Sequence, residues 1–198
     1  MKIRIIHWSD FNCPYSYIGL KRLSDAVNEL NLNPEWELKS FELPLSHAID
    51  DKDLEEIGKK DGLIIKSISL TSSRNAHRLT KFVENNYPKL SQDLIFKIYE
   101  SNFSKNEDIS DIEVLTNIAA SAGLNEKQIR EMLLSNSYDF EVELDTQDAL
   151  FNGINSIPHY ILYVDGQQLI VPGAFEKEDF KIALKDLISG ELKYKTFL

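Results

Sequence analysis

The chain has 198 residues and is acidic, with 32 Asp and Glu against 22 Lys and Arg and a formal net charge of −10. A surface this acidic repels phosphate backbones and anionic lipid heads, so we expect neither nucleic acid nor a membrane as a partner. The single cysteine excludes an intramolecular disulfide framework. The N-terminus turns polar too soon for a signal peptide, and a cytoplasmic location is expected.

The N-terminal part predicts a strand, a helix and a second strand. Residues 3–9 are rich in β-branched side chains, which favour a strand. Apolar residues then recur at helical spacing from Tyr17 to Leu30. Residues 35–42 alternate between apolar and polar side chains, which predicts a second strand roughly parallel to the first. Together the three elements predict a βαβ unit, whose crossover is normally right-handed.

The next hundred or so residues are predicted to be mostly helical. Ser110-x-x-Glu113 is a capping box that predicts the start of one helix, and Asn125-x-x-Gln128 predicts the start of another. Residues 138–152 predict a longer helix.

The β pattern returns near the C-terminus. Residues 160–164 predict a strand, Asp165-Gly166 predicts a hairpin turn, and residues 169–171 predict the returning strand. An amphipathic helix around Phe180 follows. Without the middle helices, the order of elements leaves a compact α/β unit of four strands with covering helices.

This order is similar to the thioredoxin layout, and we therefore expect an α/β thioredoxin fold with a large all-helical insertion. The thioredoxin-like domain is expected to comprise residues 1–45 and 154–198. The inserted helical domain is expected to comprise residues 46–153 and to form a lid or second lobe.

Cys13 is predicted to lie where the first strand meets the first helix. The first turn of a helix has unpaired N–H groups and a partial positive charge, both of which favour a thiolate. Cysteines in such positions can have a pKa lowered to about 3.5–7.5. Ser16, three residues on, could donate a hydrogen bond to the sulfur. We therefore expect a reactive thiol rather than an inert buried cysteine.

Several segments match a known family in the order in which they occur. Residues 9–19, S-D-F-N-C-P-Y-S-Y-I-G, compare with "D-F-x-C-P-W-C-Y-I-G", and residues 76–79 match "A-H-R-L". Residues 153–158, G-I-N-S-I-P, compare with "G-V-x-G-V-P", in which the proline is cis. On these segments the chain resembles the FrnE-like branch of the DsbA-type oxidoreductases over nearly its whole length.

The resemblance implies roles for further residues. It makes Pro158 the family's cis-proline, with the backbone of Ile157 pairing with substrate, whereas the alternative is a strand-start proline without further role. Pro14 and Tyr15 would adjoin the substrate.

His77, Arg78 and His159 each allow a functional and a structural role. His77 and Arg78 could line a cleft between lobes and contact a thiol cofactor, or they could serve only helix packing. His159, directly after the proline, could tune the thiolate. The four histidines, His7, His47, His77 and His159, lack the ligand spacing of a zinc site, so no metal is expected.

Ser16 stands where the family has its second cysteine. Cys13 could attack a disulfide, but the mixed disulfide would then need an external thiol such as glutathione. The sequence thus predicts monothiol chemistry, either reduction or isomerisation of disulfides or glutathione-mixed disulfides. We expect no tightly bound cofactor, a low-molecular-weight thiol as co-substrate, and a disulfide-containing protein or small thiol as substrate. A homodimer is left open.

Two other functions fit the same sequence. The serine at the helix start also resembles the kappa-class glutathione transferases and hydroxychromene-carboxylate isomerases, which implies a glutathione-dependent transferase or isomerase. A non-catalytic binding protein that kept the thioredoxin fold is the other alternative.

Overall fold

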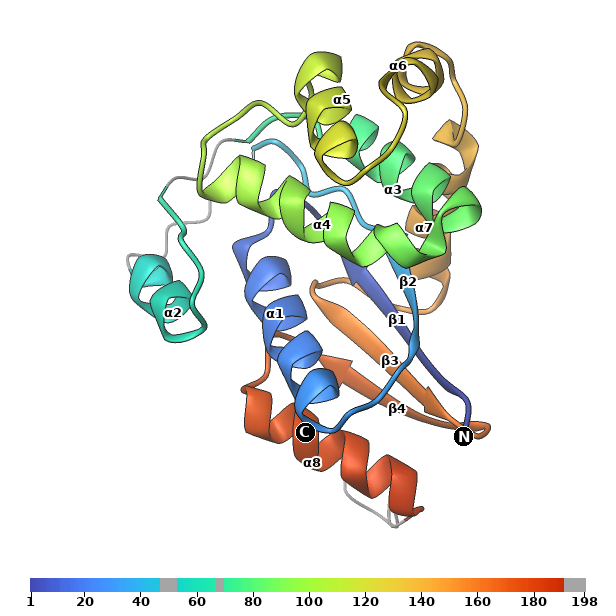
Figure 1. Cartoon of the computed structure of the whole chain (residues 1–198). Helices are drawn as coiled ribbons and strands as arrows, with labels where there is room; N and C mark the ends of the chain where they lie inside the picture. The colour runs from blue at the N-terminus through green and yellow to red at the C-terminus, as the bar shows by residue number, and fades with distance from the viewer. Residues whose placement is uncertain (47–52, 67–69, 191–198) are drawn as a thin grey trace.

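The computed structural model describes residues 1–46, 53–66 and 70–190 (Figure 1). Within them a four-stranded sheet has the order β2-β1-β3-β4. Its strands are β1 (Ile3–Ser9), β2 (Glu35–Ser40), β3 (His159–Val164) and β4 (Gln167–Pro172). β1 pairs parallel with β2 and antiparallel with β3, and β3 pairs antiparallel with β4. A βαβ unit joined to a β-hairpin in this way confirms the predicted thioredoxin fold.

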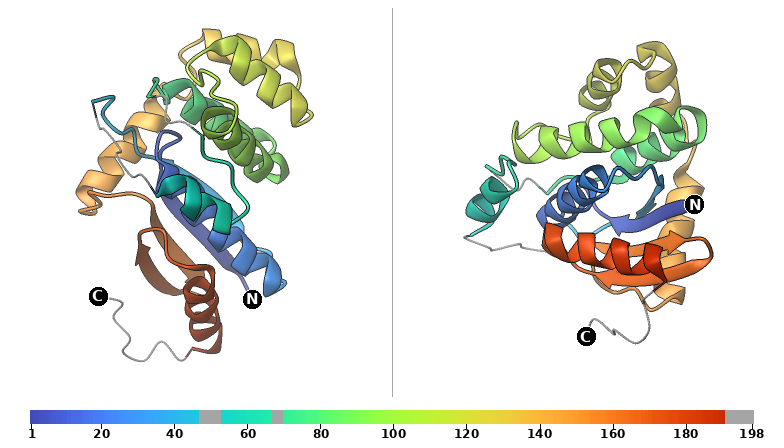
Figure 2. Two further views of the ribbon diagram at one scale, coloured as in Figure 1. Left: turned by 90° about the vertical axis from the view of Figure 1, so that its left-hand side faces the viewer. Right: turned by 60° about the horizontal axis from the view of Figure 1, so that its bottom comes forward.

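Helices cover both faces of the sheet. They are α1 (Pro14–Glu29), α2 (Leu54–Lys60), α3 (Arg74–Asn86), α4 (Pro88–Phe103), α5 (Ile112–Ser121), α6 (Glu126–Leu134), α7 (Asp139–Phe151) and α8 (Lys177–Ser189). α1 and α8 lie side by side on one face (Figure 2). There Ile3 and Ile5 of β1 pack with Leu23 and Phe180. Ala149 of α7 packs with β1 on the other face.

Helices α2 to α7 lie between β2 and β3 in the chain, where the insertion was predicted. They do not form a lobe with a separate core. Phe11, Tyr17 and Leu38 of the thioredoxin part belong to the same buried cluster as Leu79 and Leu94 of the helical part. The helical part is therefore packed directly on the start of α1. The exact boundaries at residues 46 and 153 stay a prediction.

A stack of aromatic rings joins α1 to α4. Tyr17 lies with its ring centroid 5.0 Å from that of Tyr99, and Phe103 follows at 6.2 Å from Tyr99. The Tyr17–Tyr99 and Tyr99–Phe103 planes are inclined by only 13° and 12°. Stacked aromatic pairs add to the stability that burial of their area gives. This stack begins one turn of α1 beyond Cys13.

The outer edge of β2 is covered by charged side chains of α3 and α7. Glu84 accepts the Leu38 N–H at 2.8 Å, and Lys81 donates to the Leu38 carbonyl at 2.6 Å. Asp145 accepts the Ser40 N–H at 2.9 Å and forms an ion pair with Lys81. An edge strand whose backbone groups are satisfied in this way is protected against pairing with another chain.

Local signals in the sequence were mostly confirmed, with small corrections. Asn125 caps α6 by accepting the Gln128 N–H at 3.0 Å, as predicted. The predicted capping box at Ser110 was wrong, because Asp111 is the N-cap of α5 and accepts the Glu113 N–H. The Ser110 hydroxyl instead donates to Asp108.

The end of β2 differs slightly from the prediction. β2 ends at Ser40 rather than at residue 42, and Leu43 N–H then donates to the carboxylate of Asp10. No helix within the described part of the chain is long and apolar enough to cross a membrane.

Candidate active site

Cys13 is the N-cap residue of α1, at the junction predicted from the sequence. Its backbone is extended, with φ −97° and ψ 109°, and Pro14 occupies the first helical turn. The Cys13 N–H donates to the Asp10 carbonyl at 3.0 Å, and the Ser16 N–H donates to the Cys13 carbonyl at 3.0 Å. Proline suits this turn because its missing N–H would have no helical partner there. The cysteine side chain is only 4% exposed.

Burial raises the pKa of the Cys13 thiol to about 11. Hydrogen bonds from the Ser16 side chain and backbone favour the thiolate, whereas the charge of Asp10 disfavours it. The lowered pKa predicted from the sequence was therefore wrong. Removal of the sulfur from water is the largest influence on this pKa, and it outweighs the two hydrogen bonds from Ser16.

Ser16 is completely buried one turn into α1. Its hydroxyl has no hydrogen-bond partner among the described residues, and it favours the thiolate form of Cys13. No other acceptor competes for this hydroxyl, so it can donate to a Cys13 thiolate. No second thiol can take this position, since Cys13 is the chain's single cysteine.

The loop before β3 contains the predicted cis bond, between Ile157 and Pro158. β3 pairs with β1 through His159 opposite Trp8, so the antiparallel register carries Pro158 to the level of Ser9. The Pro158 carbonyl accepts the Gly173 N–H at 2.7 Å. The cis-proline loop and the loop to Cys13 thus leave the same end of neighbouring strands. The roles of Pro158 and Ile157 towards a substrate stay a prediction.

The inserted helices hold the segment that precedes Cys13. From α4, the Tyr99 hydroxyl donates to the Asp10 carbonyl at 3.3 Å and Asn102 donates to the Phe11 carbonyl at 2.9 Å. The Asn12 side chain donates to the Thr71 carbonyl at 2.8 Å. These contacts fix the backbone from which the helix start and the thiol extend.

Asp10, Tyr99 and Asn102 were not singled out from the sequence. Asp10 stands in the quoted D-F-x-C pattern, which could have identified it. Tyr99 and Asn102 lie one turn apart on a helix that has no sequence signal connecting it to Cys13.

His77 is fully buried against this segment, so it does not line an open cleft. Its Nε2 lies 3.4 Å from Oδ1 of Asp10, and its ring packs on Phe11 with centroids 4.9 Å apart. Among the described residues neither ring nitrogen has a hydrogen-bond partner. The Asp10 carboxylate accepts N–H groups from Asn12 and Leu43.

Arg78 does not face the site either. Its guanidinium is buried and donates to backbone carbonyls in the last turn of α6 and in the connection to α7, those of Met132, Leu133, Ser135 and Ser137. Burial lowers its pKa. The expectation that Arg78 binds substrate gives way to a structural role, in which it holds the α6–α7 connection.

The remaining predicted positions are Pro14, Tyr15, His159 and His47. Pro14 is buried, and Tyr15 is half-buried against the helical core. His159 is half-buried, packs edge-on against Trp8 at 6.1 Å, and has a pKa lowered by burial. His47 lies outside the described residues. Among those described, no three His, Cys, Asp or Glu side chains are grouped to hold a metal ion.

Fold and site together define a thioredoxin-fold protein with a single thiol at the start of its first sheet-packed helix. The family model described as DSBA-like thioredoxin domain matches residues 4–185, and the chain belongs to this family.

Relatives and solved structures agree with this assignment. The "Uncharacterized protein YwbO" of Bacillus subtilis is 22% identical over 94% of this chain and 98% of its own length. The probable DsbA oxidoreductase SCO1869 from Streptomyces coelicolor has a TM-score of 0.78 at 24% identity, covering 99% of this chain and 94% of that one. The cytosolic disulfide reductase DsbM from Pseudomonas aeruginosa has a TM-score of 0.73 at 14% identity, covering 94% and 98%. A second structure of DsbM, with GSH, is also similar to this chain.

Proposed function

We propose that this chain is a thiol–disulfide oxidoreductase that works with one thiol, Cys13. The observation that carries the proposal is the placement of that thiol at the N-cap of α1, where the buried Ser16 hydroxyl favours its thiolate form. Membership of the DSBA-like family and the fold shared with a cytosolic disulfide reductase support it.

The reaction is a thiol–disulfide exchange in two steps. In the first, Cys13 attacks a disulfide R–S–S–R′, a Cys13–S–S–R bond forms, and R′ leaves as a thiol that takes up the cysteine's proton. In the second, an external thiol of the glutathione class attacks the mixed disulfide. This attack releases Cys13 as the thiol and leaves R in a disulfide with the external thiol. Cys13 thereby regains its proton, and the cycle has exchanged one partner of the substrate disulfide.

Burial of Cys13 limits the rate of the first step. With a pKa of about 11, on the order of one Cys13 in ten thousand is a thiolate at pH 7. Since the thiolate is the attacking species, the resting protein reacts slowly with small disulfides. A bound substrate that donates a hydrogen bond to the buried sulfur would raise this fraction, and the backbone of Ile157 beside Pro158 is the proposed place where that substrate pairs.

The test is intact mass after incubation with oxidised glutathione. One glutathione adduct is expected on the unaltered chain, reversed by dithiothreitol, and none on Cys13→Ser. An unaltered chain that gives no adduct even near pH 10 would contradict the proposal and favour a non-catalytic binding protein.

A glutathione-dependent transferase or isomerase predicts a different pattern. It requires glutathione to bind to Cys13→Ser as tightly as to the unaltered chain, with turnover retained. Calorimetric titration of both proteins with reduced glutathione separates it from the monothiol reaction, which needs the sulfur.

A further inference from the structure

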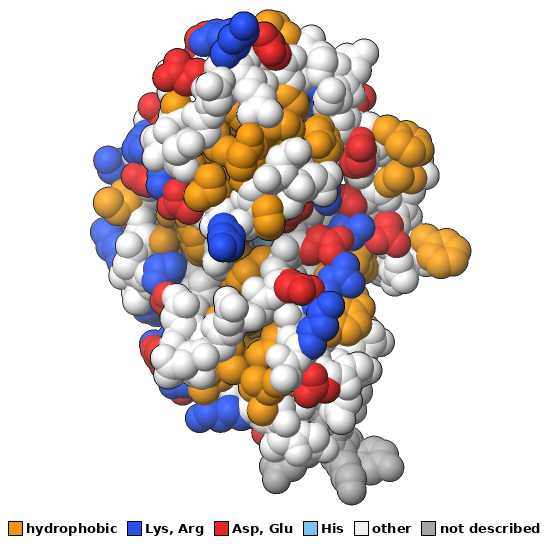
Figure 3. Space-filling model, turned by 45° about the vertical axis from the view of Figure 1, so that its right-hand side comes forward, with side chains coloured by type: hydrophobic (Ala, Val, Ile, Leu, Met, Phe, Trp, Pro, Cys, Tyr) orange, Lys and Arg blue, Asp and Glu red, His pale blue; other side chains and the backbone are white. Residues whose placement is uncertain are grey.

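Helix α7 presents an apolar stripe to solvent. Phe140, Leu144 and Phe151 are 69%, 44% and 91% exposed. Spacings of four and seven residues place them along one face of a helix. Leu150, also 69% exposed, lies beside the stripe. Figure 3 shows hydrophobic side chains projecting from the right-hand edge of the molecule, where α7 lies.

The stripe faces away from the core. The buried residues of α7 are Val142, Asp145 and Ala149, which face α3 and the sheet. Packing inside the molecule therefore does not account for the exposure of Phe140 and Phe151. Exposed apolar groups gathered in this way, with polar residues around them, mark interaction sites.

Carboxylates border the stripe, and cations are scarce beside it. Of the thirteen residues of α7, five are Asp or Glu and none is Lys or Arg: Asp139, Glu141, Glu143, Asp145 and Asp148. Glu141 and Asp148 lie on one side of the stripe, and Asp139 and Glu143 lie on the other.

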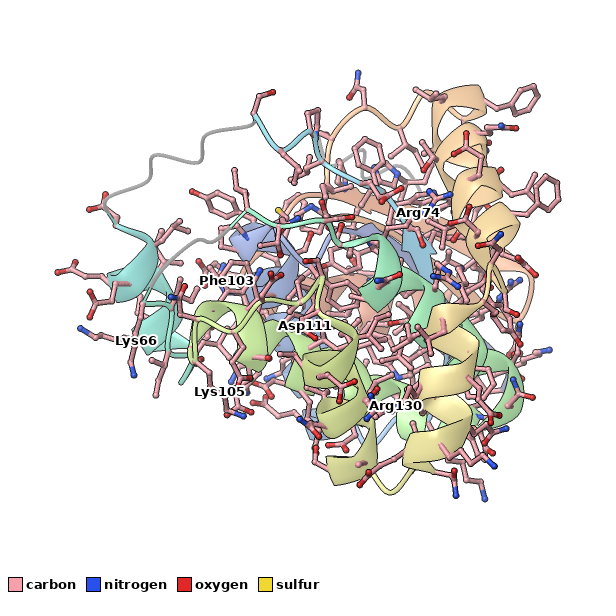
Figure 4. All side chains as sticks on the ribbon, turned by 90° about the horizontal axis from the view of Figure 1, so that it is seen from above. Lys66, Arg74, Phe103, Lys105, Asp111 and Arg130 are labelled. Atoms are coloured by element: carbon pink, nitrogen blue, oxygen red, sulfur yellow. The ribbon has the colours of Figure 1, made fainter. Side chains whose placement is uncertain are left out.

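The neighbouring cations are shared among several carboxylates. Arg74, which projects from α3 beside α7 (Figure 4), lies within 4 Å of Glu42, Asp139 and Glu143. Lys39 lies equally close to Glu37, Asp145 and Asp148. Arg74 and Lys39 thus each serve three carboxylates, and Lys81 pairs with the buried Asp145, so the described surface around the stripe keeps a negative excess.

The negative charge around the stripe favours a cationic partner over a second copy of this chain. In a symmetric dimer formed through α7, the acidic borders of the two copies would face one another, and such like-charge contacts oppose association. A cationic partner gains from the same borders.

We propose that α7 is a docking surface for a basic amphipathic segment of a partner protein. The apolar side of that segment covers Phe140, Leu144 and Phe151, and its Lys and Arg lie along the carboxylate borders. The twelve residues from Phe140 to Phe151 extend for about 16 Å, so a partner helix of about three turns covers the stripe. The inference does not depend on the chemistry of Cys13.

The test is binding of a fluorescently labelled peptide of about 14 residues, with Leu at helical spacing and Lys elsewhere, followed by anisotropy. There are two control peptides. One has the same composition in scrambled order, and the other has Glu in place of every Lys. The full chain is expected to bind the patterned cationic peptide at least about tenfold more tightly than either control.

Variants locate the binding site. Phe140→Ser with Phe151→Ser is expected to weaken binding at least about tenfold, since central aromatic side chains dominate such interfaces. Ile170→Ser and Ile182→Ser, at residues 49% and 46% exposed on β4 and α8, are matched controls expected to bind within about twofold of the unaltered chain. Cys13→Ser is expected to bind unchanged. Circular dichroism checks that each variant is folded.

Three results would overturn the proposal. One is equal binding of patterned and scrambled peptides, and another is unchanged binding by the Phe140/Phe151 variant. The third is sedimentation showing that the unaltered chain self-associates and that this variant is monomeric, which would make α7 a contact between copies.

Discussion

Nε2 of His77 lies 3.4 Å from Oδ1 of Asp10, and both side chains are completely buried. This contact joins α3 of the helical insertion to the segment that leads into Cys13. Because the same carboxylate also accepts the Leu43 N–H, Asp10 connects the end of β1, the chain after β2 and the insertion. The position of the thiol therefore depends on residues far away in the sequence.

Replacing His77 by alanine is expected to destabilise the fold by about 3 kcal/mol. The change leaves a cavity beside Phe11 and removes the imidazole next to a buried carboxylate. Urea denaturation followed by circular dichroism measures the loss. Lys127→Ala, at a side chain 84% exposed on α6, is the control and is expected to change stability by less than about 0.5 kcal/mol. A loss below about 1 kcal/mol for His77→Ala would show that the contact contributes little.

The Cys13 thiol is expected to titrate near pH 11, because burial raises its pKa. Thiolate absorbance against pH, with Cys13→Ala subtracted, reports the value. An inflection below pH 8 would show that the helix terminus and Ser16 outweigh burial.

The same shift predicts a stability effect with a definite sign. The folded chain retains the thiol proton to about pH 11, whereas an unfolded cysteine loses it near pH 9. The stabilisation is present below pH 9 and is lost as the pH rises towards 11, by up to roughly 2 kcal/mol relative to Cys13→Ala. Chemical denaturation of both proteins at pH 7 and pH 10.5 measures this difference. A constant difference between the two would contradict the shift.

The lowered pKa of His7 predicts that the free energy of unfolding falls at acidic pH. Burial and the charge of Lys81 lower its pKa from 6.5 to about 3, and Ser9 hydrogen-bonds its ring at 2.9 Å. Its contribution is full above pH 6.5 and is lost as the pH falls towards 3, because the unfolded histidine becomes protonated first. His7→Gln is expected to flatten this part of the profile of unfolding free energy against pH. A profile of unchanged slope would contradict the assignment.

Asp145 on α7 is expected to be the critical residue of the covered β2 edge. Asp145→Asn leaves the buried Lys81 without its carboxylate and should cost about 3 kcal/mol. Asp148→Asn, at a carboxylate 43% exposed and 3.7 Å from Lys39, is the matched control and should cost less than about 1 kcal/mol. Urea midpoints of the two variants measure the contrast, and equal midpoints would contradict it.

The sequence predicted the order of strands and helices because their signals are local. The hairpin at Asp165-Gly166, where both residues have positive φ, and the cap at Asn125 depend on a few adjacent residues. The placement of Cys13 at the start of α1 followed from the same kind of signal.

The environment of the thiol could not be predicted in this way. Its burial depends on α4, some ninety residues away, and on the Asp10–His77 contact, neither of which leaves a periodic pattern. The family motif pointed to His77 and Arg78 but not to their surroundings. His77 is a buried neighbour of Asp10, and Arg78 binds carbonyls at the end of α6 and in the connection to α7.

One-thiol chemistry is tested most directly by the release of a mixed disulfide. The glutathione adduct of Cys13 is isolated, and its loss is followed by intact mass at increasing concentrations of reduced glutathione. The account predicts a rate proportional to external thiol and close to zero without it. In Ser16→Cys the adduct is expected to be lost without external thiol, as an internal disulfide forms and glutathione leaves. Release from the unaltered chain at a rate independent of external thiol would contradict the account.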